Sequence, residues 1–267
     1  MLKISEIWVI DETYFVKFDC IHNIKSLARV LVRHAKLWRV QQALGCYGSC
    51  LRRPPTAWAT LLCLWLVFAT SVAAPDLDKT QALALERHGV RAAETIAAWR
   101  RLVEDSKALP DNDKLNMANT FFNRRMLFED DIVVWNQVDH WATPLEFMGR
   151  GSGDCEDYAI AKYITLQMMG MSNERMRLIY VRAKSGATAS VAHMVLGFYP
   201  QPSDEPLILD NLISSVRPAS QRPDLSPIFS FNNNGLWVGG ASASSADPTA
   251  RLSRWRDVLD RMRQEGL

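Results

Sequence analysis

The sequence contains neither a Cys-x-x-Cys pair nor a His-Glu-x-x-His motif. Both patterns are common ligand sets for zinc, so their absence argues against a zinc site. The formal net charge is only +2, and Lys and Arg form no stripe along the chain. Binding to nucleic acid requires such a concentration of positive charge, so this class of function is excluded. We also find no internal repeats.

The chain also lacks an apolar run of the ~18 to 20 residues that a membrane-spanning helix needs. A shorter apolar stretch, residues 57–69, follows Arg52 and Arg53 and leads into small residues. A basic start, a hydrophobic centre and small residues at a cleavage site are typical of a secretory signal peptide. We therefore expect residues 51–74 to be a signal peptide, with cleavage preferred after Ala73. An uncleaved anchor is the alternative.

Residues 1–50 stand in front of this expected signal peptide, which is an unusual position for one. The segment is mixed basic and apolar, without clear periodicity. One interpretation is a start codon assigned too far upstream. Because no Met occurs between Met1 and Met117, a later start would then use a non-Met codon. Candidates are Val40, Leu44 and Leu51. The other interpretation is a genuine N-terminal extension, and mass spectrometry of the secreted protein's N-terminus distinguishes the two.

Cysteine is scarce in the region expected to remain. Four of the five cysteines precede the expected cleavage site, so residues 75–267 contain Cys155 alone. An oxidising compartment pairs structural cysteines, so a lone thiol there is either an inert buried residue or a reactive one. The roughly 190 residues are enough for one domain with a sizeable core. The four cysteines outside that domain are Cys20, Cys46, Cys50 and Cys63.

The sequence around Cys155 predicts a helix that begins at this residue. Gly151 and Gly153 permit a tight turn, and Asp154 is suited to cap the helix. A helix N-terminus favours thiolate over thiol, as does a protonated histidine, whereas dry surroundings raise the pKa of a cysteine. Apolar residues then follow at helical spacing: Ala159, Ile160, Tyr163, Ile164 and Met168.

Two residues further along the chain stand where a thiol enzyme needs a base and an orienting acid. His193 lies in a strand-like run that is apolar on both faces, and Asp210 closes the short strand 207–209. The order Cys, His, Asp is the one expected of a papain-like or transglutaminase-like enzyme. The plainer interpretations are a core histidine and an aspartate that caps a turn. His140 is an alternative base, less favoured because it lies in a loop before the cysteine.

The remaining pattern predicts an α+β fold. Trp135 and Trp141 either line a substrate cleft or fill the core, and Asp131 is expected in a solvated turn. Three helices are predicted. The first comprises residues 76–106, with Gly89 as a candidate break. The second carries Phe121 and Phe122 and is capped by Asp111 or Asn112, and the final helix is capped by Asp247. The predicted strands are residues 176–183 and 190–199, then 207–209, then a hairpin of 229–231 and 236–238 around Asn-Gly.

Four segments resemble the bacterial transglutaminase-like cysteine peptidases of the LapG type, which are periplasmic proteases of biofilm adhesins. They are residues 139–147, 151–163, 192–196 and 209–211. The resemblance implies a transglutaminase/papain-like core, in which N-terminal helices and a catalytic-Cys helix pack on an antiparallel sheet. It makes Cys155 the nucleophile, His193 the general base and acid, and Asp210 the residue that orients the imidazole. Backbone amides at the helix start would meet the oxyanion.

The resemblance also implies a metal and partners. It places calcium near Asp154 and Glu156, with Asp139 as a further candidate, because calcium prefers several hard oxygen ligands. The plainer role of Asp154, Glu156 and Asp157 is to cap the helix. The resemblance to the family further implies cleavage of a very large surface adhesin near its N-terminus, at paired alanines. It also implies that the periplasmic domain of a membrane-bound cyclic-di-GMP receptor inhibits the protease. The alternatives are a protein transglutaminase, a non-catalytic calcium-dependent binding module and a cell-wall amidase.

Overall fold

The structure, a computed structural model, describes residues 74–267 except 187–188, 240 and 242. The expected N-terminal extension (1–50) and all but the last residue of the expected signal peptide (51–74) lie outside the described residues. Within the part of the chain that is described, no helix combines the length and the apolar character needed to span a bilayer.

Three helices open the folded part. Gly89, with φ of 85°, separates the first two, so the expected break in residues 76–106 is confirmed. Pro110 precedes the third helix and no side chain caps it. The expected cap is therefore wrong, because Asp111 already lies within the helix. The helices are α2 (Leu77–His88), α3 (Val90–Ser106) and α4 (Asp111–Arg125).

A short irregular region then leads to the cysteine. The expected loop before Cys155 is interrupted by a helix that begins at Pro144. Thr143 caps it: its hydroxyl oxygen accepts the Glu146 N–H at 3.2 Å, and the Glu146 carboxylate accepts the Thr143 N–H at 2.9 Å. The elements are β1 (Leu127–Phe128), α5 (Asp131–Val134), α6 (Pro144–Arg150), β2 (Ser152–Gly153) and α7 (Cys155–Met168), and β1 pairs with β2 in parallel.

The second half of the chain forms an antiparallel sheet of six strands in the order β6-β5-β4-β3-β7-β8. The strands expected at residues 176–183 and 190–199 are confirmed and pair with each other as β3 and β4, and the expected hairpin around Asn-Gly is confirmed as β7 and β8. The strands are β3 (Met176–Ser185), β4 (Ala189–Phe198), β5 (Leu207–Leu209), β6 (Arg217–Pro218), β7 (Leu225–Phe231) and β8 (Leu236–Val238). The 3-10 turns η2 (Asn173–Arg175) and η3 (Ala219–Gln221) precede β3 and β7.

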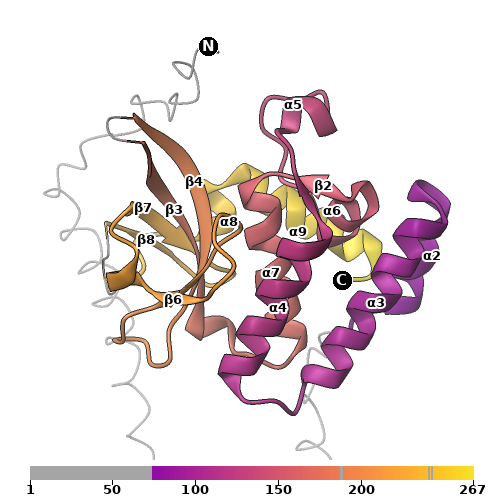
Figure 1. Ribbon diagram of the computed structural model, residues 1–267, viewed down its shortest axis with the longest axis horizontal. Coiled ribbons are helices and arrows are strands. Elements are labelled where there is room, and N and C mark those ends of the chain that lie inside the picture. Colours follow the sequence, from indigo (N-terminus) through magenta and orange to yellow (C-terminus); the bar gives the residue numbers. More distant parts are fainter. Residues whose placement is uncertain (1–73, 187–188, 240, 242) are drawn as a thin grey trace, which may run out of the picture. The chain divides into compact units, whose positions relative to one another are not determined.

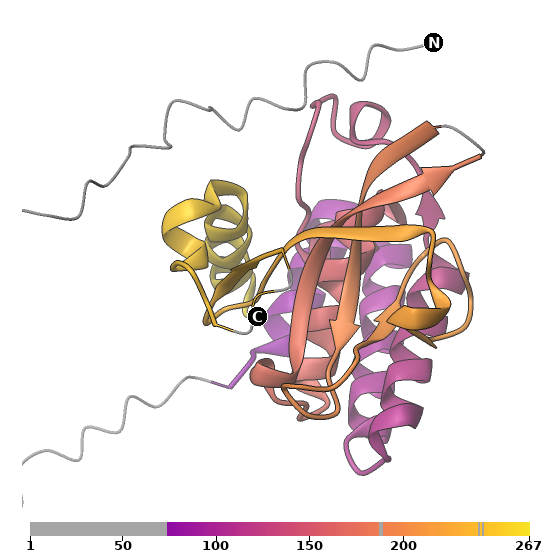
Figure 2. The same cartoon turned by 90° about the vertical axis from the view of Figure 1, so that its left-hand side faces the viewer.

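Helices α2, α3, α4, α6 and α7 lie on one side of the sheet, as Figures 1 and 2 show. The main core fills the space between these layers, and α7 packs against β3 and β4. Inside it, the indole N–H of Trp99 donates to the Thr165 hydroxyl at 2.7 Å, so even this buried polar group is satisfied. A smaller cluster of Ile179, Val181, Val195 and Ile208 packs on alternate positions of the strands. The α+β prediction is confirmed.

The C-terminal segment forms two helices where one was expected. Asp247 caps the first, α8 (Pro248–Arg251), by accepting the Thr249 N–H at 2.8 Å. Leu252 then adopts an extended conformation, which separates α8 from α9 (Ser253–Glu265). Helix α9 returns to the start of α2, where the Asp76 N–H donates to the Gly266 carbonyl at 2.7 Å.

Candidate active site

The turn before Cys155 needs both of its glycines. Gly151 has φ of 76°, a left-handed conformation that ends α6 and is easily adopted only by glycine. Gly153 is needed for space, because a Cβ atom there would lie 2.2 Å from Oδ2 of Asp157. Asp154 stands at the N-cap position, but its side chain accepts no capping hydrogen bond. The expected cap at α7 is therefore wrong, since this carboxyl interacts with Glu156 instead.

Cys155 is the first residue of α7 and is partly buried. Its thiol donates to Oε2 of Glu156 at 3.0 Å. Helix α7 packs against β4, and the backbone N–H of Met194, the residue after His193, acts to lower the pKa of the thiol. Burial, followed by the charges of Glu156 and Asp154, raises the pKa of the thiol well above its ordinary value. With this set of charges the thiol therefore holds its proton.

His193 and Asp210 are brought together. His193 on β4 is 5% exposed and Asp210, just after β5, is 1% exposed. Nε2 of the imidazole lies 2.8 Å from Oδ1 of the carboxylate. Burial raises the pKa of Asp210, but the hydrogen bond and charge of His193, with the Leu212 N–H and Arg222, lower it to about 2 overall. Asp210 is therefore ionised and paired with the ring.

The alternative base, His140, has a different environment. Its ring packs against Trp135, with centroids 4.5 Å apart and the ring planes tilted by 41°, and its Nε2 lies 3.7 Å from Oε2 of Glu146. Within the described residues, no hydrogen bond joins it to Cys155. Trp141 is 8% exposed and stacks on Phe231, so it fills the core.

Sequence reasoning missed the residues of α4 that hold the loop after β5. Nδ2 of Asn123 donates to the Asp210 carbonyl at 2.8 Å, and Nδ2 of Asn119 donates to the Ser214 carbonyl at 2.9 Å. Asn123 and Asp210 are 87 positions apart, and a polar residue on a helix carries no local sign of a partner so distant. These bonds fix the backbone that carries Asp210.

Five acids gather in front of α7. They are Asp131, Asp139, Asp154, Glu156 and Asp157. Two sets of three acids, and a third set made of Asp154, Cys155 and Glu156, each bring one possible ligand atom per residue within 4.8 Å of the others. Burial first, and neighbouring carboxylates second, raise the pKa of Asp154 to about 10 and that of Glu156 to about 7. Asp131 is 2% exposed, so its expected place in a solvated turn is wrong, whereas its charged neighbours Glu129 and Asp130 are exposed as expected. Within this acidic cluster, the buried carboxylate oxygens without a hydrogen-bond partner in the described part are Oδ1 of Asp131, Asp139 and Asp154, and Oδ2 of Asp157.

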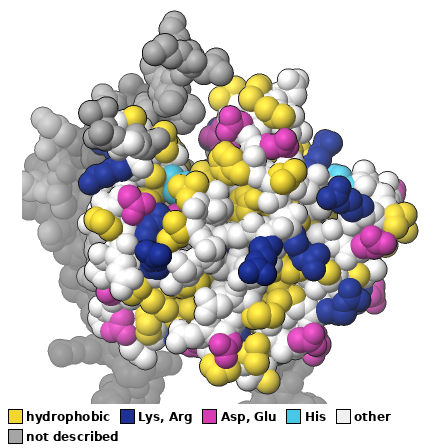
Figure 3. All heavy atoms as spheres, viewed as in Figure 1, with side chains coloured by type: hydrophobic (Ala, Val, Ile, Leu, Met, Phe, Trp, Pro, Cys, Tyr) yellow, Lys and Arg dark blue, Asp and Glu magenta, His cyan; other side chains and the backbone are white. Residues whose placement is uncertain are grey.

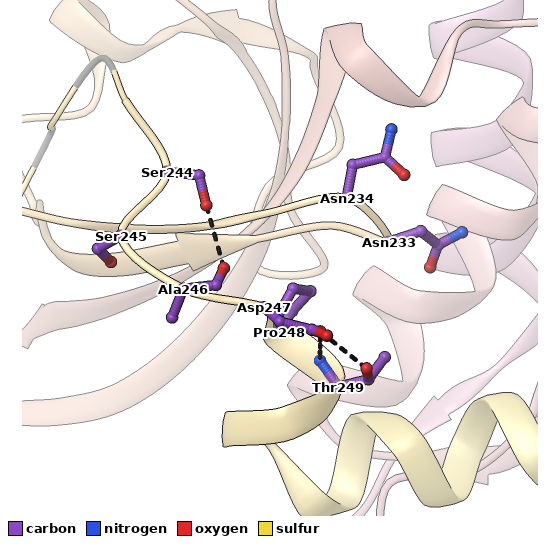
Figure 4. A pocket seen from close by; sticks show the side chains of 8 residues that line it. All are labelled: Asn233, Asn234, Ser244, Ser245, Ala246, Asp247, Pro248 and Thr249. Atoms are coloured by element: carbon purple, nitrogen blue, oxygen red, sulfur yellow. Dashed lines mark hydrogen bonds between the residues drawn. The ribbon is translucent and has the colours of Figure 1, made fainter. Parts of the chain in front are cut away.

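The surface of the molecule has an exposed apolar region near α5 and a separate polar hollow. Hydrophobic side chains gather near acidic ones where the α5 loop projects (Figure 3). The exposed apolar residues of this region are Leu127, Phe128, Ile132, Val133 and Val138. Elsewhere, a polar hollow of about 560 Å³ lies between the β7–β8 turn and α8 (Figure 4). None of the three catalytic candidates lines it.

Lys162, on α7, is fully buried and faces Asp210. Burial lowers its pKa to about 7, although Asp210 acts in the opposite direction. Because the unfolded chain keeps a lysine pKa of about 10.4, it binds more protons than the folded state between these values. Stability then rises with pH across this window. We expect Lys162→Met to raise the melting temperature at pH 7 by several degrees, with the difference from wild type shrinking toward pH 10.

Thermal unfolding followed by circular dichroism at several pH values measures this effect. The exposed Lys107→Met is the control and should change neither the melting temperature nor its pH slope. Equal slopes in wild type and Lys162→Met would contradict the prediction.

Comparisons with known proteins support the α+β fold and show that the chain belongs to a family of cysteine peptidases. Residues 95–237 match the model of a family described as bacterial transglutaminase-like cysteine proteinase. LapG of Legionella pneumophila is 39% identical over 71% of this chain and all of that chain in its EGTA-treated structure, with a TM-score of 0.62. The calcium-bound LapG structure is 39% identical, covers 70% of this chain and 98% of that one, and has a TM-score of 0.61. No curated protein sequence matches.

Proposed function

Because the chain belongs to the bacterial transglutaminase-like cysteine proteinases, we propose that it is a calcium-dependent periplasmic endopeptidase that cleaves a large surface adhesin near its N-terminus. The enzyme class, cysteine peptidase, follows from the family. The observation that carries the proposal is Cys155 at the start of α7, beside β4, together with the bonded pair His193 and Asp210.

The reaction follows from this arrangement. The Cys155 thiol passes its proton to His193, and the thiolate attacks the peptide carbonyl carbon. His193 protonates the leaving amine, the C–N bond breaks, and a thioester remains on the sulfur. His193 then takes a proton from water, which attacks the thioester; the new carboxylic acid leaves and the proton returns to sulfur. Since Nε2 bonds Asp210, Nδ1 is the nitrogen that remains for these transfers. Backbone amides at the start of α7 stabilise the oxyanion.

The acidic cluster fits calcium. Its oxygens converge, several lack a hydrogen-bond partner in the described part, and carboxylate oxygens are ligands that calcium prefers. Asp131, Asp139, Asp154 and Glu156 would hold the ion, with loop carbonyls completing its shell. The bound ion supplies positive charge that offsets the acids beside Cys155. A LapG relative described as calcium-bound supports calcium binding, although not a particular set of ligands.

We expect an excess of chelator to reduce the cleavage rate by about 10- to 100-fold, the usual scale for losing a supporting site. In Glu156→Ala, chelator and calcium should give equal rates, because a ligand has been removed. Calcium should also raise the melting temperature of the wild type and leave that of Glu156→Ala unchanged. Glu129→Ala, an exposed acid of the same region, should retain the full calcium response. Equal wild-type rates in chelator and in calcium would refute calcium dependence.

The substrate, partner and localisation rest on the family resemblance. Release of the adhesin would promote biofilm dispersal, and the periplasmic domain of a membrane-bound cyclic-di-GMP receptor would hold the protease inactive. Periplasmic location is supported by the expected signal peptide, residues 51–74.

The test is to incubate the purified protein with N-terminal fragments of large adhesins from the same genome. Products are identified by mass spectrometry in calcium, in chelator and with a labelled primary amine. A cut at paired alanines supports the proposal. Incorporation of the amine without a cut would make the protein a transglutaminase, because an amine then resolves the thioester. Neither product, with both proteins folded and calcium present, would favour a calcium-dependent binding module.

A further inference from the structure

Asp210 is held from both sides. His193 and the Leu212 N–H both contact Oδ1, and Nη2 of Arg222 forms an ion pair with Oδ2 at 2.8 Å. The Arg222 side chain is only 4% exposed and the Asp210 side chain is fully buried. An arginine buried against a carboxylate in this way is costly to desolvate, so the contact is unusual for a residue without a role.

Arg222 is itself fixed in one orientation. It follows η3, and its Nε and Nη2 donate to the two carboxylate oxygens of Asp224 at 3.0 and 2.7 Å. The carbonyl of Asp224 accepts the N–H of Lys184, at the end of β3, at 2.9 Å. This two-point contact uses the rigid planar fork of the guanidinium. The charge that meets Asp210 is therefore anchored to the central sheet.

A carboxylate bonded at one oxygen can still turn about its Cβ–Cγ bond, because the torsion angle of this bond has a broad distribution. A cation 2.8 Å from the other oxygen favours one orientation of the carboxylate plane through charge, although this oxygen accepts no hydrogen bond among the described residues. Lys162 also faces Asp210, but among the described residues its Nζ has no hydrogen-bond partner. Arg222 is thus the cation in direct contact with the carboxylate.

We propose that Arg222 is a positioning residue, which holds the Asp210 carboxylate so that Oδ1 meets Nε2 of His193. It acts through Asp210 and does not touch the substrate. The inference rests on the proposed Cys–His–Asp mechanism and adds a fourth residue behind it.

Arg222→Met should lower kcat by about 10- to 100-fold, on the scale of outer partners of functional groups, and change KM by less than about twofold. Arg222→Lys keeps the charge without the fork and should recover part of kcat. The matched control is Arg87→Met, because Arg87 pairs with the buried Glu265 at 3.0 Å away from the triad. It should leave kcat unchanged, and thermal unfolding shows which variants are folded.

A double-mutant cycle tests the route of the effect. If Arg222 acts through Asp210, Arg222→Met should change kcat little once Asp210 is Asn. An additional loss as large as in the wild type would overturn the proposal.

A second readout does not need activity. In protein labelled with ¹⁵N-histidine, the Nε2 proton of His193 should give a slowly exchanging downfield signal. That signal should persist in Arg87→Met and weaken or vanish in Arg222→Met. Its persistence in Arg222→Met would overturn the positioning role, even if no adhesin is cleaved by any variant. A wild type that shows the signal but cleaves nothing would refute the proposed function alone.

Discussion

Cys155→Ala is expected to abolish cleavage, with a loss in kcat of about 10⁶-fold, the scale found when a catalytic nucleophile is removed. Without the sulfur no thioester forms, and the pair of His193 and Asp210 has no nucleophile to activate. The methyl group fits the space of the thiol, and the lost hydrogen bond is one to Glu156. The variant should therefore fold, so its failure to cleave will show the loss of the nucleophile and not a loss of structure.

The measurement is cleavage of an adhesin fragment in calcium, with products identified by mass spectrometry. Cys155→Ser is a useful companion, because it keeps a hydroxyl nucleophile of higher pKa and should also be nearly inactive. The wild type treated with iodoacetamide should lose activity as the sulfur is alkylated. Cleavage by Cys155→Ala at the wild-type rate would show that another group, or an activated water, carries the reaction.

Asp210→Asn is expected to reduce kcat by about 10⁴-fold while changing KM little, as with other catalytic triads that lose this charge. The amide presents N–H groups to Nε2 of His193 and favours the wrong tautomer. It also removes the negative charge that stabilises the imidazolium. Arg222 would lose one of its two carboxylate partners as well, so some loss of stability is expected.

Asp224→Asn is the matched control for that loss. Asp224 also contacts Arg222 but has no contact with His193, so its kcat should fall far less. Steady-state kinetics and thermal unfolding on both variants separate the two effects. Equal losses of kcat in Asp210→Asn and Asp224→Asn would mean that the ion pair, and not contact with the imidazole, determines activity.

Features with a local cause were predictable from the sequence. The start of α7 at Cys155 follows from the preceding glycines, and the β7–β8 hairpin follows from Asn-Gly between two apolar runs. The break at Gly89 is likewise local. Even where the element was right, tertiary contacts changed its details: Asp154 lies at the N-cap position but turns toward Glu156 rather than toward the helix amides.

Features that depend on distant partners were not predictable. Asp131 and its neighbouring charges suggest a solvated turn, yet folding brings Asp131 against Asp154 and Asp157 from another segment. Arg222 lies in a run of Pro and Ser that carries no strand or helix signal, and only the folded chain sets it against Asp210. Side-chain identity was visible in each case, but the partner was not.

The junction between α9 and α2 has a consequence for the order in which the protein can fold. The Thr80 hydroxyl donates to the Glu265 carbonyl at 2.9 Å, across 185 positions of chain, next to the bond between Asp76 and Gly266. A ribosome delivers α2 long before it delivers α9, and closing so long a loop is slow. In the nascent chain, α2 can therefore pack on α3 and α6, but it lacks its contacts with α9 until residues 265–266 have emerged.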